Sequence, residues 1–387
     1  MSKPRRHDGQ LRFGLMWPNT QSHNVTSRVV ADANPDILDV ANHLELARTV
    51  EETGLDYVFF ADSYTVNSPA SAAAGHGEPR IFAPIWAAAV IGATKHIGVV
   101  TTLHTRYLSP VLIARIGANL DVLSGGRWGW NIVPGSKAAE SALFGFDNLE
   151  HDRRYEYGAE TLTAVKALWR AGREPIEFTG EHVRLSGALC GPTPVQRPNP
   201  VIFNPGVSPA GLDLIASECD FGFSAVVDDW SKVRSAVDRV TAKAAEFGRA
   251  PSSVGLVGSI GVVIGQSMAD AEERLEWFRS VVDIEAARGF ANFFLANSKT
   301  YRGLFEGQDY EQLVRRIGVG AGSTVLCGTA EEVAEQFVEL NKATGMSNFL
   351  LLPMTFDSAE IAGYGRMLPH LQRAGVWTPP SQRGWSW

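Results

Sequence analysis

The segment Leu123–Ala159, LSGGRWGWNIVPGSKAAESALFGFDNLEHDRRYEYGA, contains the pattern that decides the fold. It predicts the end of a helix, a tight turn at Gly125–Gly126, a buried strand, a loop and a second helix. Asn131 lies where that strand would end. His151 and Tyr155 lie four residues apart in the second helix, so they share one face. The segment therefore predicts a strand–helix unit whose polar groups could hold the ring and phosphate of a cofactor.

The same alternation extends along the whole chain. Eight runs have the length and composition of buried strands: Arg12–Trp17, Tyr57–Ala61, Ile97–Thr102, Trp128–Val133, Pro200–Asn204, Phe221–Ala225, Val254–Ile264 and Asn348–Leu352. Helical patterns lie between most of them and after the last: Leu38–Thr53, Ala83–Ala93, Val111–Leu123, Arg153–Trp169, Ala210–Ser217, Trp230–Phe247, Ala269–Ala287, Ala330–Lys342 and Ala359–Ala374. Thr329 and Glu332 have the spacing of a capping box. This pattern predicts an α/β fold, a (β/α)8 barrel of the TIM type, with an open doubly wound sheet as the alternative.

Three segments interrupt the alternation, at about residues 63–80, 171–197 and 289–323. The first reads as a long loop, the second as a small β excursion, and the third follows the helix after the seventh strand. Connections of this length inside a compact domain are usually functional. We expect residues 1–387 to form a single barrel domain with these excursions. The tail TPPSQRGWSW carries two tryptophans, which we expect to pack on a neighbouring surface or subunit.

The composition excludes several classes of protein. The chain has 387 residues, of which 45% are hydrophobic and 20% are charged, as in an ordinary globular protein. A net charge of −7 argues against a nucleic-acid partner. No apolar run approaches the ~18 residues of a membrane helix, and no secretory signal is evident, so we expect a cytoplasmic protein. Cys190, Cys219 and Cys327 are widely spaced and odd in number, as reduced structural cysteines would be.

Polar side chains recur where the predicted strands end. Asp62 follows the second strand, Thr102 closes the third, Asn131 lies in the fourth and Ser208 follows the fifth. The carboxyl ends of barrel strands meet at one rim, so these residues together outline a site, although each alone could be a turn or capping residue. Ser208 followed by Pro209 has the form of a helix N-cap, whose free N–H groups can bind phosphate.

Histidine supplies a further candidate. His104, just past the third strand, could act as an acid or a base because histidine titrates near neutrality. It could equally be a rim residue bonded to the backbone. His23 and His76 lie in loops that could reach the same rim. The chain has no HxxxH, HExxH or cysteine cluster, so no metal is predicted, and it has no GxSxG or GxGxxG spacing.

The chain also carries five motifs of a known kind: FFAD at Phe59–Asp62, TT at Thr101–Thr102, LSGGRWGWNIV at Leu123–Val133, EHDRRY at Glu150–Tyr155 and PGVSPAG at Pro205–Gly211. Together they resemble the bacterial luciferase-like flavin monooxygenases. The similarity is to the branch that includes nitrilotriacetate, dibenzothiophene-sulfone and pyrimidine monooxygenases. It extends from the first strand to the last helix and is weakest between about residues 289 and 323.

The resemblance implies where a flavin would be held. By position it implies FMN contacts at Asp62, Thr102, Asn131, Glu140, His151, Arg154, Tyr155 and Ser208. Tyr155 and Ser208 would hold the phosphate, with Arg154 near it, and Thr102 and Asn131 would face the reactive middle ring. The sequence departs from the pattern at Pro134, where the branch has Thr or Ser, and at Asn204-Pro205, which replaces Gln-Ala. The first change would remove one hydrogen bond to the ring.

The resemblance also implies an activity. Reduced FMN would arrive from a separate NAD(P)H-dependent flavin reductase and react with O2. The resulting flavin peroxide would oxygenate a small organic substrate of the heterocycle, amine or organosulfur class. Thr102 and Asn131, which the resemblance places at the ring, would be catalytic together with His104, which is a candidate from its position and titration alone. We expect a homodimer or homotetramer. Two alternatives are a deazaflavin-dependent dehydrogenase on the same barrel, which the EHDRRY motif disfavours, and a flavin-binding relative without activity.

Overall fold

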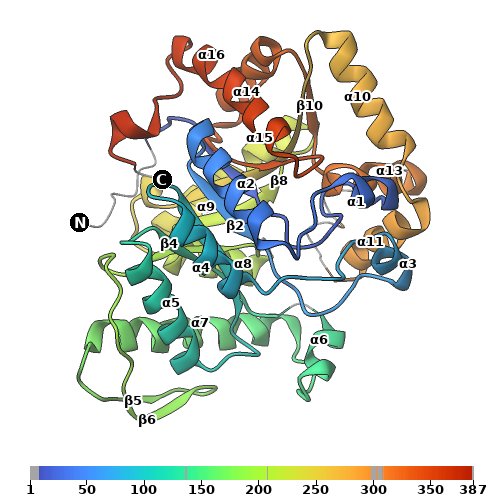
Figure 1. Cartoon of the computed structure of the whole chain (residues 1–387). Helices are drawn as coiled ribbons and strands as arrows, with labels where there is room; N and C mark the ends of the chain where they lie inside the picture. The colour runs from blue at the N-terminus through green and yellow to red at the C-terminus, as the bar shows by residue number, and fades with distance from the viewer. Residues whose placement is uncertain are drawn as a thin grey trace.

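The computed structural model describes residues 8–135, 137–206, 208–297, 302, 307 and 309–385. Its strands are β1 (Arg12–Met16), β2 (Tyr57–Phe60), β3 (Gly98–His104), β4 (Trp128–Val133), β5 (Ile176–Thr179), β6 (Arg184–Ala188), β7 (Val201–Asn204), β8 (Phe221–Ala225), β9 (Gly255–Ile264), β10 (Val325–Gly328) and β11 (Asn348–Leu352). Eight of them pair in the order β1-β2-β3-β4-β7-β8-β9-β11, and β11 returns to β1. All these pairings are parallel, so the sheet closes on itself and the predicted (β/α)8 barrel is confirmed (Figure 1).

The helices surround the barrel (Figure 1). They are α1 (Arg28–Ala33), α2 (Val40–Thr53), α3 (Pro69–Ala73), α4 (Ala83–Ala93), α5 (Pro110–Leu123), α6 (Ala138–Leu143), α7 (His151–Ala171), α8 (Pro209–Glu218), α9 (Trp230–Glu246), α10 (Met268–Ser280), α11 (Ile284–Asn297), α13 (Tyr310–Gly318), α14 (Ala330–Thr344), α15 (Ser358–Tyr364) and α16 (Leu368–Arg373). The predicted capping box at Thr329 and Glu332 is confirmed at the start of α14. The second excursion is the antiparallel hairpin β5–β6, and the first contains α3. The third contains α13 and lies partly outside the described residues.

All eight predicted strands are confirmed, and β10 is a strand that the sequence pattern did not indicate. It has four residues and pairs with Gly261–Ile264 of β9. β9 has ten residues and β8 only five, so β9 continues past the end of its neighbour. β10 covers the edge that this difference in length leaves open, because unpaired backbone groups there would otherwise lack partners.

Two predicted helices are each broken into two. The pattern Ala269–Ala287 is divided between α10 and α11, because Asp283 accepts a hydrogen bond from the N–H of Ala286 and starts a new helix. The pattern Ala359–Ala374 becomes α15, a 3-10 turn and α16. Pro369 lies in the first turn of α16 and has no N–H to continue the α-helical ladder across that turn.

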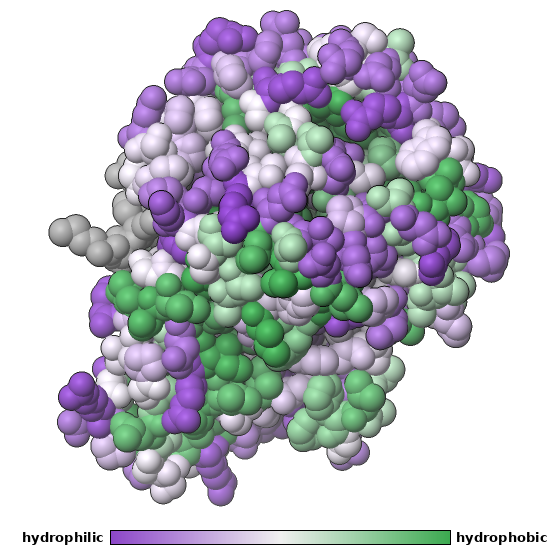
Figure 2. Space-filling view, viewed as in Figure 1, coloured by the Kyte–Doolittle hydropathy of each residue, from purple (hydrophilic) through white to green (hydrophobic). Residues whose placement is uncertain are grey.

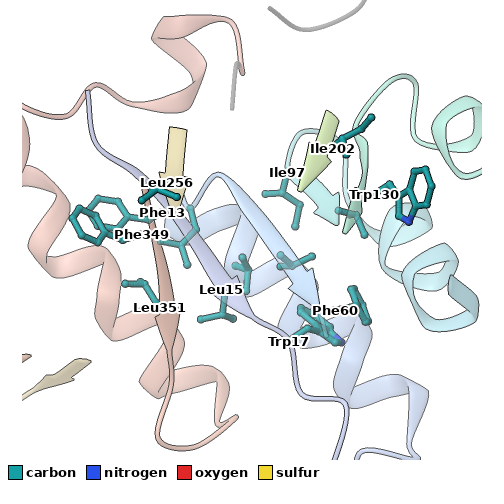
Figure 3. Close-up of a cluster of buried hydrophobic side chains, with 14 of the residues drawn as sticks. Phe13, Leu15, Trp17, Phe60, Ile97, Trp130, Ile202, Leu256, Phe349 and Leu351 are labelled. Atoms are coloured by element: carbon teal, nitrogen blue, oxygen red, sulfur yellow. The ribbon is translucent and has the colours of Figure 1, made fainter. Parts of the chain in front are cut away.

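Two layers of apolar side chains fill the molecule. The barrel interior is packed with Tyr57, Phe59, Val100, Val201, Phe203, Phe221, Val257 and Leu350, which come from alternate positions of the strands. A larger cluster lies between the strands and the helices, with Phe13, Leu15 and Trp17 of β1 and the adjoining turn against Phe60 and Phe349 (Figure 3). Because the interior is solid, ligands can meet the barrel only at its ends.

Several exposed apolar side chains lie on the outer surface, and among them two groups can be distinguished by the helices that carry them. Over α4 and α5, Ile85, Leu112 and Leu123 are 67%, 44% and 60% exposed, and a second group lies on the lobe formed by α6 (Figure 2). None of the described helices is both long and apolar enough to cross a membrane.

The C-terminal tail packs at the amino end of the barrel, as expected for its described part. The indole of Trp385 stacks on His96, with ring centroids 3.8 Å apart. Arg383 is buried and its Nη1 lies 2.5 Å from Oδ1 of the buried carboxylate of Asp56, just before β2. Trp387 lies outside the described residues.

Candidate functional site

At the carboxyl end of the barrel, three strand ends are joined by side-chain hydrogen bonds. Thr102 lies opposite Asn131 in the register of β3 and β4. Nδ2 of Asn131 donates to Oγ1 of Thr102 at 2.8 Å, and this hydroxyl donates to the carbonyl of Phe60 at 2.9 Å. Both polar side chains are buried, and Oδ1 of Asn131 has no partner. The pair is therefore fixed in position and retains one buried acceptor for a ligand.

Strand alternation determines which threonine faces this end. Val100 belongs to the barrel interior, so Thr102 and His104, two and four residues later, point the same way. Thr101 points outward, where its Oγ1 accepts from Nε1 of Trp128 at 2.8 Å. The TT motif thus contains one inward and one structural threonine.

His104 lies at the rim, as predicted. It is 2% exposed, and neither ring nitrogen makes a hydrogen bond of normal geometry. The ring of Tyr64 lies 5.0 Å away between centroids. Burial lowers the pKa of His104 to about 4, so the imidazole is neutral at neutral pH. The neutral ring has one N–H and one bare nitrogen, so it can donate and accept a hydrogen bond and can take up a proton at the bare nitrogen.

Two carboxylates, Asp62 and Glu140, adjoin the same rim. Oε1 of Glu140 accepts from Oγ of Ser63 at 2.7 Å and from the N–H of Tyr64 at 2.9 Å, while the buried Oε2 has no partner. Oδ1 of Asp62 accepts from the N–H of Ser63 at 2.8 Å. Burial raises the pKa of Asp62 to about 6, and the charge of Arg80 opposes this rise.

Two cations at this rim were not predicted from the sequence. Nζ of Lys137 donates to Oγ of Ser63 at 2.6 Å and lies 3.9 Å from Oε1 of Glu140. Burial lowers the pKa of Lys137 to about 8 and also lowers that of Arg80, whose Nε has no partner. Lys137 could have been found from the sequence, because it lies three residues before Glu140 and residues at this spacing share one face of a helix. Arg80 lies in a loop, where no sequence periodicity indicates which way a side chain points.

A second group of predicted residues lies where α7 and α8 begin. Ser208 is the N-cap of α8, with Pro209 at N1, as expected, and its Oγ accepts from the N–H of Gly211 at 3.2 Å. Burial raises the pKa of the Tyr155 hydroxyl, and Ser208 lies close enough to oppose this rise. A Cβ at Gly206 would lie 2.2 Å from that hydroxyl, so only glycine fits beneath it. The two hydroxyls and the start of α8 form a polar cradle.

Arg154 and His151 flank this cradle. Nη1 of Arg154 donates to the carbonyl of Gly135 at 3.0 Å, which joins α7 to the loop after β4, and its Nε has no partner. The rings of His151 and Tyr155 lie 5.2 Å apart, so the predicted shared face is confirmed. The Nδ1 atom of His151 lies 2.6 Å from Oδ1 of Asp152, and its side chain is 25% exposed. Of the predicted residues, His151 therefore lies at the outer edge of the cradle.

The unsatisfied polar atoms at this rim suit a flavin mononucleotide. Buried polar atoms normally have partners, so a group of unpaired ones marks a place for a polar ligand. Here they are Asn131 Oδ1, Glu140 Oε2, both nitrogens of His104 and Nε of Arg154. The hydroxyls of Tyr155 and Ser208 with Arg154 suit a phosphate, and the acceptors beside Thr102 and Asn131 suit a heteroaromatic ring with N–H groups.

Comparison with known proteins gives consistent matches. The family described as Luciferase-like monooxygenase matches residues 11–348. The chain is 31% identical to dibenzothiophene-sulfone monooxygenase of Rhodococcus erythropolis, over 89% of this chain and 88% of that protein. It is 28% identical to the FMNH2-dependent dimethylsulfone monooxygenase of Pseudomonas putida, over 94% and 95%. The crystal structure of riboflavin lyase with modified FMN and riboflavin has a TM-score of 0.87 and 26% identity, covering 96% and 93%.

Proposed function

The chain belongs to the luciferase-like monooxygenase family, as the motifs indicate, and we propose that it is a two-component, FMN-dependent monooxygenase. Reduced FMN and O2 are its co-substrates, in keeping with its FMNH2-dependent relative. One oxygen atom enters a small organic substrate and the other leaves as water, while FMNH2 is oxidised to FMN. The electrons come from a separate NAD(P)H-dependent flavin reductase.

One observation carries the proposal: the buried pair Thr102–Asn131 is preorganised but incompletely satisfied. A structural role alone would leave no reason for the unpaired Oδ1 of Asn131. Preorganised polar groups of this kind stabilise charge that develops in a reaction, because they need no reorganisation when the charge appears. Thr102 and Asn131 orient the reacting centre, and neutral His104 is placed to accept a proton there.

The remaining predicted residues hold the cofactor. Tyr155, Ser208 and Arg154 bind the phosphate, with His151 at the edge, while Asp62 and Glu140 accept hydrogen bonds near the ring. The bound flavin supplies the electrons that activate O2. The positive charges of Lys137 and Arg80 offset the negative charges of these two carboxylates. All four groups can therefore be ionised without giving the rim a large net charge.

The substrate is a small molecule of the heterocycle, amine or organosulfur class, and the protein works as a homodimer or homotetramer. An oligomer would cover the exposed apolar side chains of Ile85, Leu112 and Leu123 on α4 and α5, which supports this part of the proposal.

The test supplies photoreduced FMN, and separately a reduced deazaflavin, to the purified protein. We expect reduced FMN to bind and, with ¹⁸O2, a mass increase of two relative to ¹⁶O2 in the product from at least one probe. The probes are dibenzothiophene sulfone, dimethyl sulfone and nitrilotriacetate. Binding of deazaflavin alone, with hydride transfer and no O2 consumption, would favour the dehydrogenase. Binding of FMN without any labelled product would favour the inactive relative.

A further inference from the structure

The side chain of Lys137 connects three segments at the carboxyl end of the barrel. Its Nζ donates to Oγ of Ser63 at 2.6 Å, to the carbonyl of Thr65 at 3.0 Å and to Oδ1 of Asn67 at 3.5 Å, all in the loop after β2. It also lies 4.5 Å from the centre of the Phe293 ring in α11. Lys137 itself is the N-cap residue of α6. An ammonium group has three hydrogens, and the three oxygens of the loop use all of them.

A serine hydroxyl links Lys137 to Glu140. Oγ of Ser63 accepts from Lys137 at 2.6 Å and donates to Oε1 of Glu140 at 2.7 Å, while Nζ and Oε1 are 3.9 Å apart. The hydroxyl has one hydrogen, and the carbonyl of Thr65 is a second acceptor for it at 3.1 Å. The carboxylate is nearer and charged, so it is the stronger acceptor. The cation and the anion are therefore bridged by a single hydroxyl group.

Glu140 is held through only one of its two oxygens. Its Oε1 also accepts from the N–H of Tyr64 at 2.9 Å, whereas the buried Oε2 has no hydrogen-bond partner among the described residues. Glu140 is 1% exposed, and a carboxylate buried to this extent is costly unless a cation compensates it. Within the part of the chain that the structure describes, Lys137 is the one cation that lies within 4.0 Å of this carboxylate.

We propose that Lys137 is a positioning residue for the flavin: through Ser63 it keeps Glu140 ionised and oriented so that Oε2 can accept a hydrogen bond from the ring. The inference rests on the proposed function, which places Glu140 beside the ring of FMN. The hydrogens of Lys137 are already bonded to the loop after β2, so its effect on the flavin passes through Glu140. Without the cation, the buried carboxylate would either take up a proton or repel the anionic cofactor, and both changes weaken binding.

The ionisation of Lys137 makes this role measurable. Burial lowers the pKa of Lys137 to about 8, and the charge of Glu140 opposes this fall. Reduced FMN should bind better to the protein in which Lys137 is protonated, so its affinity should fall as the pH rises above about 8. One proton limits this fall to about tenfold per pH unit. Because linkage is reciprocal, bound FMN should in turn raise the pKa of Lys137.

The neighbouring groups do not change charge over the same range. In the described part of the chain, the charged and titratable groups that interact with Lys137 or Glu140 are Asp62, Tyr64, His76, Arg80, His104 and Tyr107. From α11 the contact is the uncharged ring of Phe293. Burial raises the pKa of Asp62 to about 6 and lowers those of the two histidines to about 4, so above pH 7 the first is ionised and the others are neutral. Burial also raises the pKa values of both tyrosines, which keep their protons, and Arg80 keeps its charge.

Variants at Lys137 test the charge. Affinity for photoreduced FMN is measured by anaerobic titration from about pH 7 to about pH 9. Lys137→Met removes the charge at similar length and should lower the affinity about tenfold or more at pH 7, as expected for a charged hydrogen bond. Lys137→Arg keeps its charge at every pH used, so its affinity should not show the fall above pH 8 that the parent shows. Lys166→Met is the matched control, because Lys166 is 9% exposed and pairs with Glu218 at the end of α8, so FMN affinity should remain parental.

A double-mutant cycle shows whether Lys137 acts through Glu140. Glu140→Gln removes the negative charge and keeps the shape of the side chain. In this background Lys137→Met should lower the affinity by at most about two- to threefold, against about tenfold or more in the parent. Ser63→Ala removes the bridging hydroxyl and should lower the affinity by about threefold or more, while Ser63→Thr should restore it.

NMR of lysine labelled with ¹³C at Cε reports the proton of Lys137 without any turnover. The signal of Lys137 is the one that is missing from Lys137→Arg. In the flavin-free parent it should titrate near pH 8, and with reduced FMN bound it should titrate at higher pH. A titration that FMN leaves unchanged would contradict the inference. This measurement and the pH dependence of Lys137→Arg decide the question even if Lys137→Met does not fold.

The outcomes separate the two proposals. If reduced FMN binds but its affinity has the same pH dependence in the parent and in Lys137→Arg, the inference is wrong and the proposed function stands. The same conclusion follows if a folded Lys137→Met variant has parental affinity, or if this substitution costs as much in the Glu140→Gln background as in the parent. If reduced FMN does not bind to the parent, the proposed function fails and the inference fails with it.

Discussion

Tyr155 offers the most direct test of the phosphate cradle. Tyr155→Phe removes one hydroxyl at a charged oxygen, a hydrogen bond worth ~1.5–3 kcal/mol. Affinity for reduced FMN should therefore fall by about one to two decades, as measured by anaerobic titration. Tyr157→Phe is the matched control, since Tyr157 lies on the same helix but its ring contacts His182 and Arg106 instead. An unchanged affinity in Tyr155→Phe would mean that the hydroxyl only braces Ser208.

The pair Thr102–Asn131 tests the chemistry. Thr102→Val and Asn131→Ala should each lower product formation by about two to three decades, because preorganised polar groups at a reacting centre contribute ~3–4 kcal/mol. FMN affinity should change far less, so the two measurements are made on the same samples. A parental rate in either variant would assign that residue a structural role.

Thr101→Val is the control for this pair. It lies one position away but points outward to Trp128, so product formation should remain parental. Loss of the hydrogen bond from Trp128 should instead decrease the free energy of unfolding by about 1 kcal/mol, as measured by urea denaturation.

The raised pKa of Asp62 predicts a pH dependence of stability. Its folded pKa of about 6 exceeds the ordinary 3.8, so the folded state binds more protons than the unfolded state between these values. The free energy of unfolding should therefore fall as the pH rises from 4 to 6, with a slope of up to about 1.4 kcal/mol per pH unit from this group. Comparing urea denaturation of the parent and Asp62→Asn at each pH isolates this slope. A difference between the two proteins that does not vary over this range contradicts the prediction.

At the residue scale, sequence could locate groups on regular elements but not in loops. Thr102, Asn131 and His104 could be placed because strand ends share a rim, and Tyr155 because of helical spacing. Arg80 and Lys137 lie in or beside loops, where the direction of a side chain depends on tertiary hydrogen bonds such as that of Lys137 to Ser63. The neutrality of the histidines depends on burial, which no local pattern reports.

At the scale of elements, α14 carries a complete capping box. The hydroxyl of Thr329 accepts from the N–H of Glu332, and Oε2 of Glu332 accepts from the N–H of Thr329. Thr329→Ala should decrease the free energy of unfolding by about 1 kcal/mol, while Thr329→Ser should retain most of it. Equal stability of the alanine and serine variants in urea denaturation would show that the cap contributes nothing.

The cap was predictable because its two residues are close in sequence. The unbroken helix predicted over Ala269–Ala287 and the missed strand β10 were wrong because both depend on tertiary contacts. The break between α10 and α11 places Asp283 so that its N–H donates to the carbonyl of Thr26, a contact far away in sequence. β10 pairs with the part of β9 that extends beyond β8. The four residues of β10 do not themselves indicate how long β8 and β9 are, so the sequence did not predict this strand.

For the whole molecule, the buried pair of Arg383 and Asp56 links the tail to the barrel. Arg383→Ala would leave the carboxylate of Asp56 buried without its partner, which should cost about 3–5 kcal/mol of unfolding free energy. Arg373→Ala, at an exposed position, should change it by less than about 0.5 kcal/mol. We further expect calorimetry to record one transition, as the proposed single domain requires. An Arg383→Ala variant as stable as the parent would contradict the role of the ion pair. Two separate transitions would contradict the single domain.

The barrel itself followed from the sequence because eight buried strands alternating with helices leave few architectures. The prediction of a closed barrel did not depend on any single residue, so errors in the predicted ends of helices did not affect it. The tail was different: its tryptophans indicated packing, but the ion pair joins residues at opposite ends of the chain and has no local signature.

That ion pair has a consequence for biosynthesis. Asp56 is made early and Arg383 late, so until residue 383 has been translated the carboxylate of Asp56 lacks its ion-pair partner. We therefore expect the barrel to reach its full stability only when residue 383 has been added. A product of premature termination or of cleavage before residue 383 would retain the defect permanently, and the cell's proteases would meet it as an incompletely folded chain.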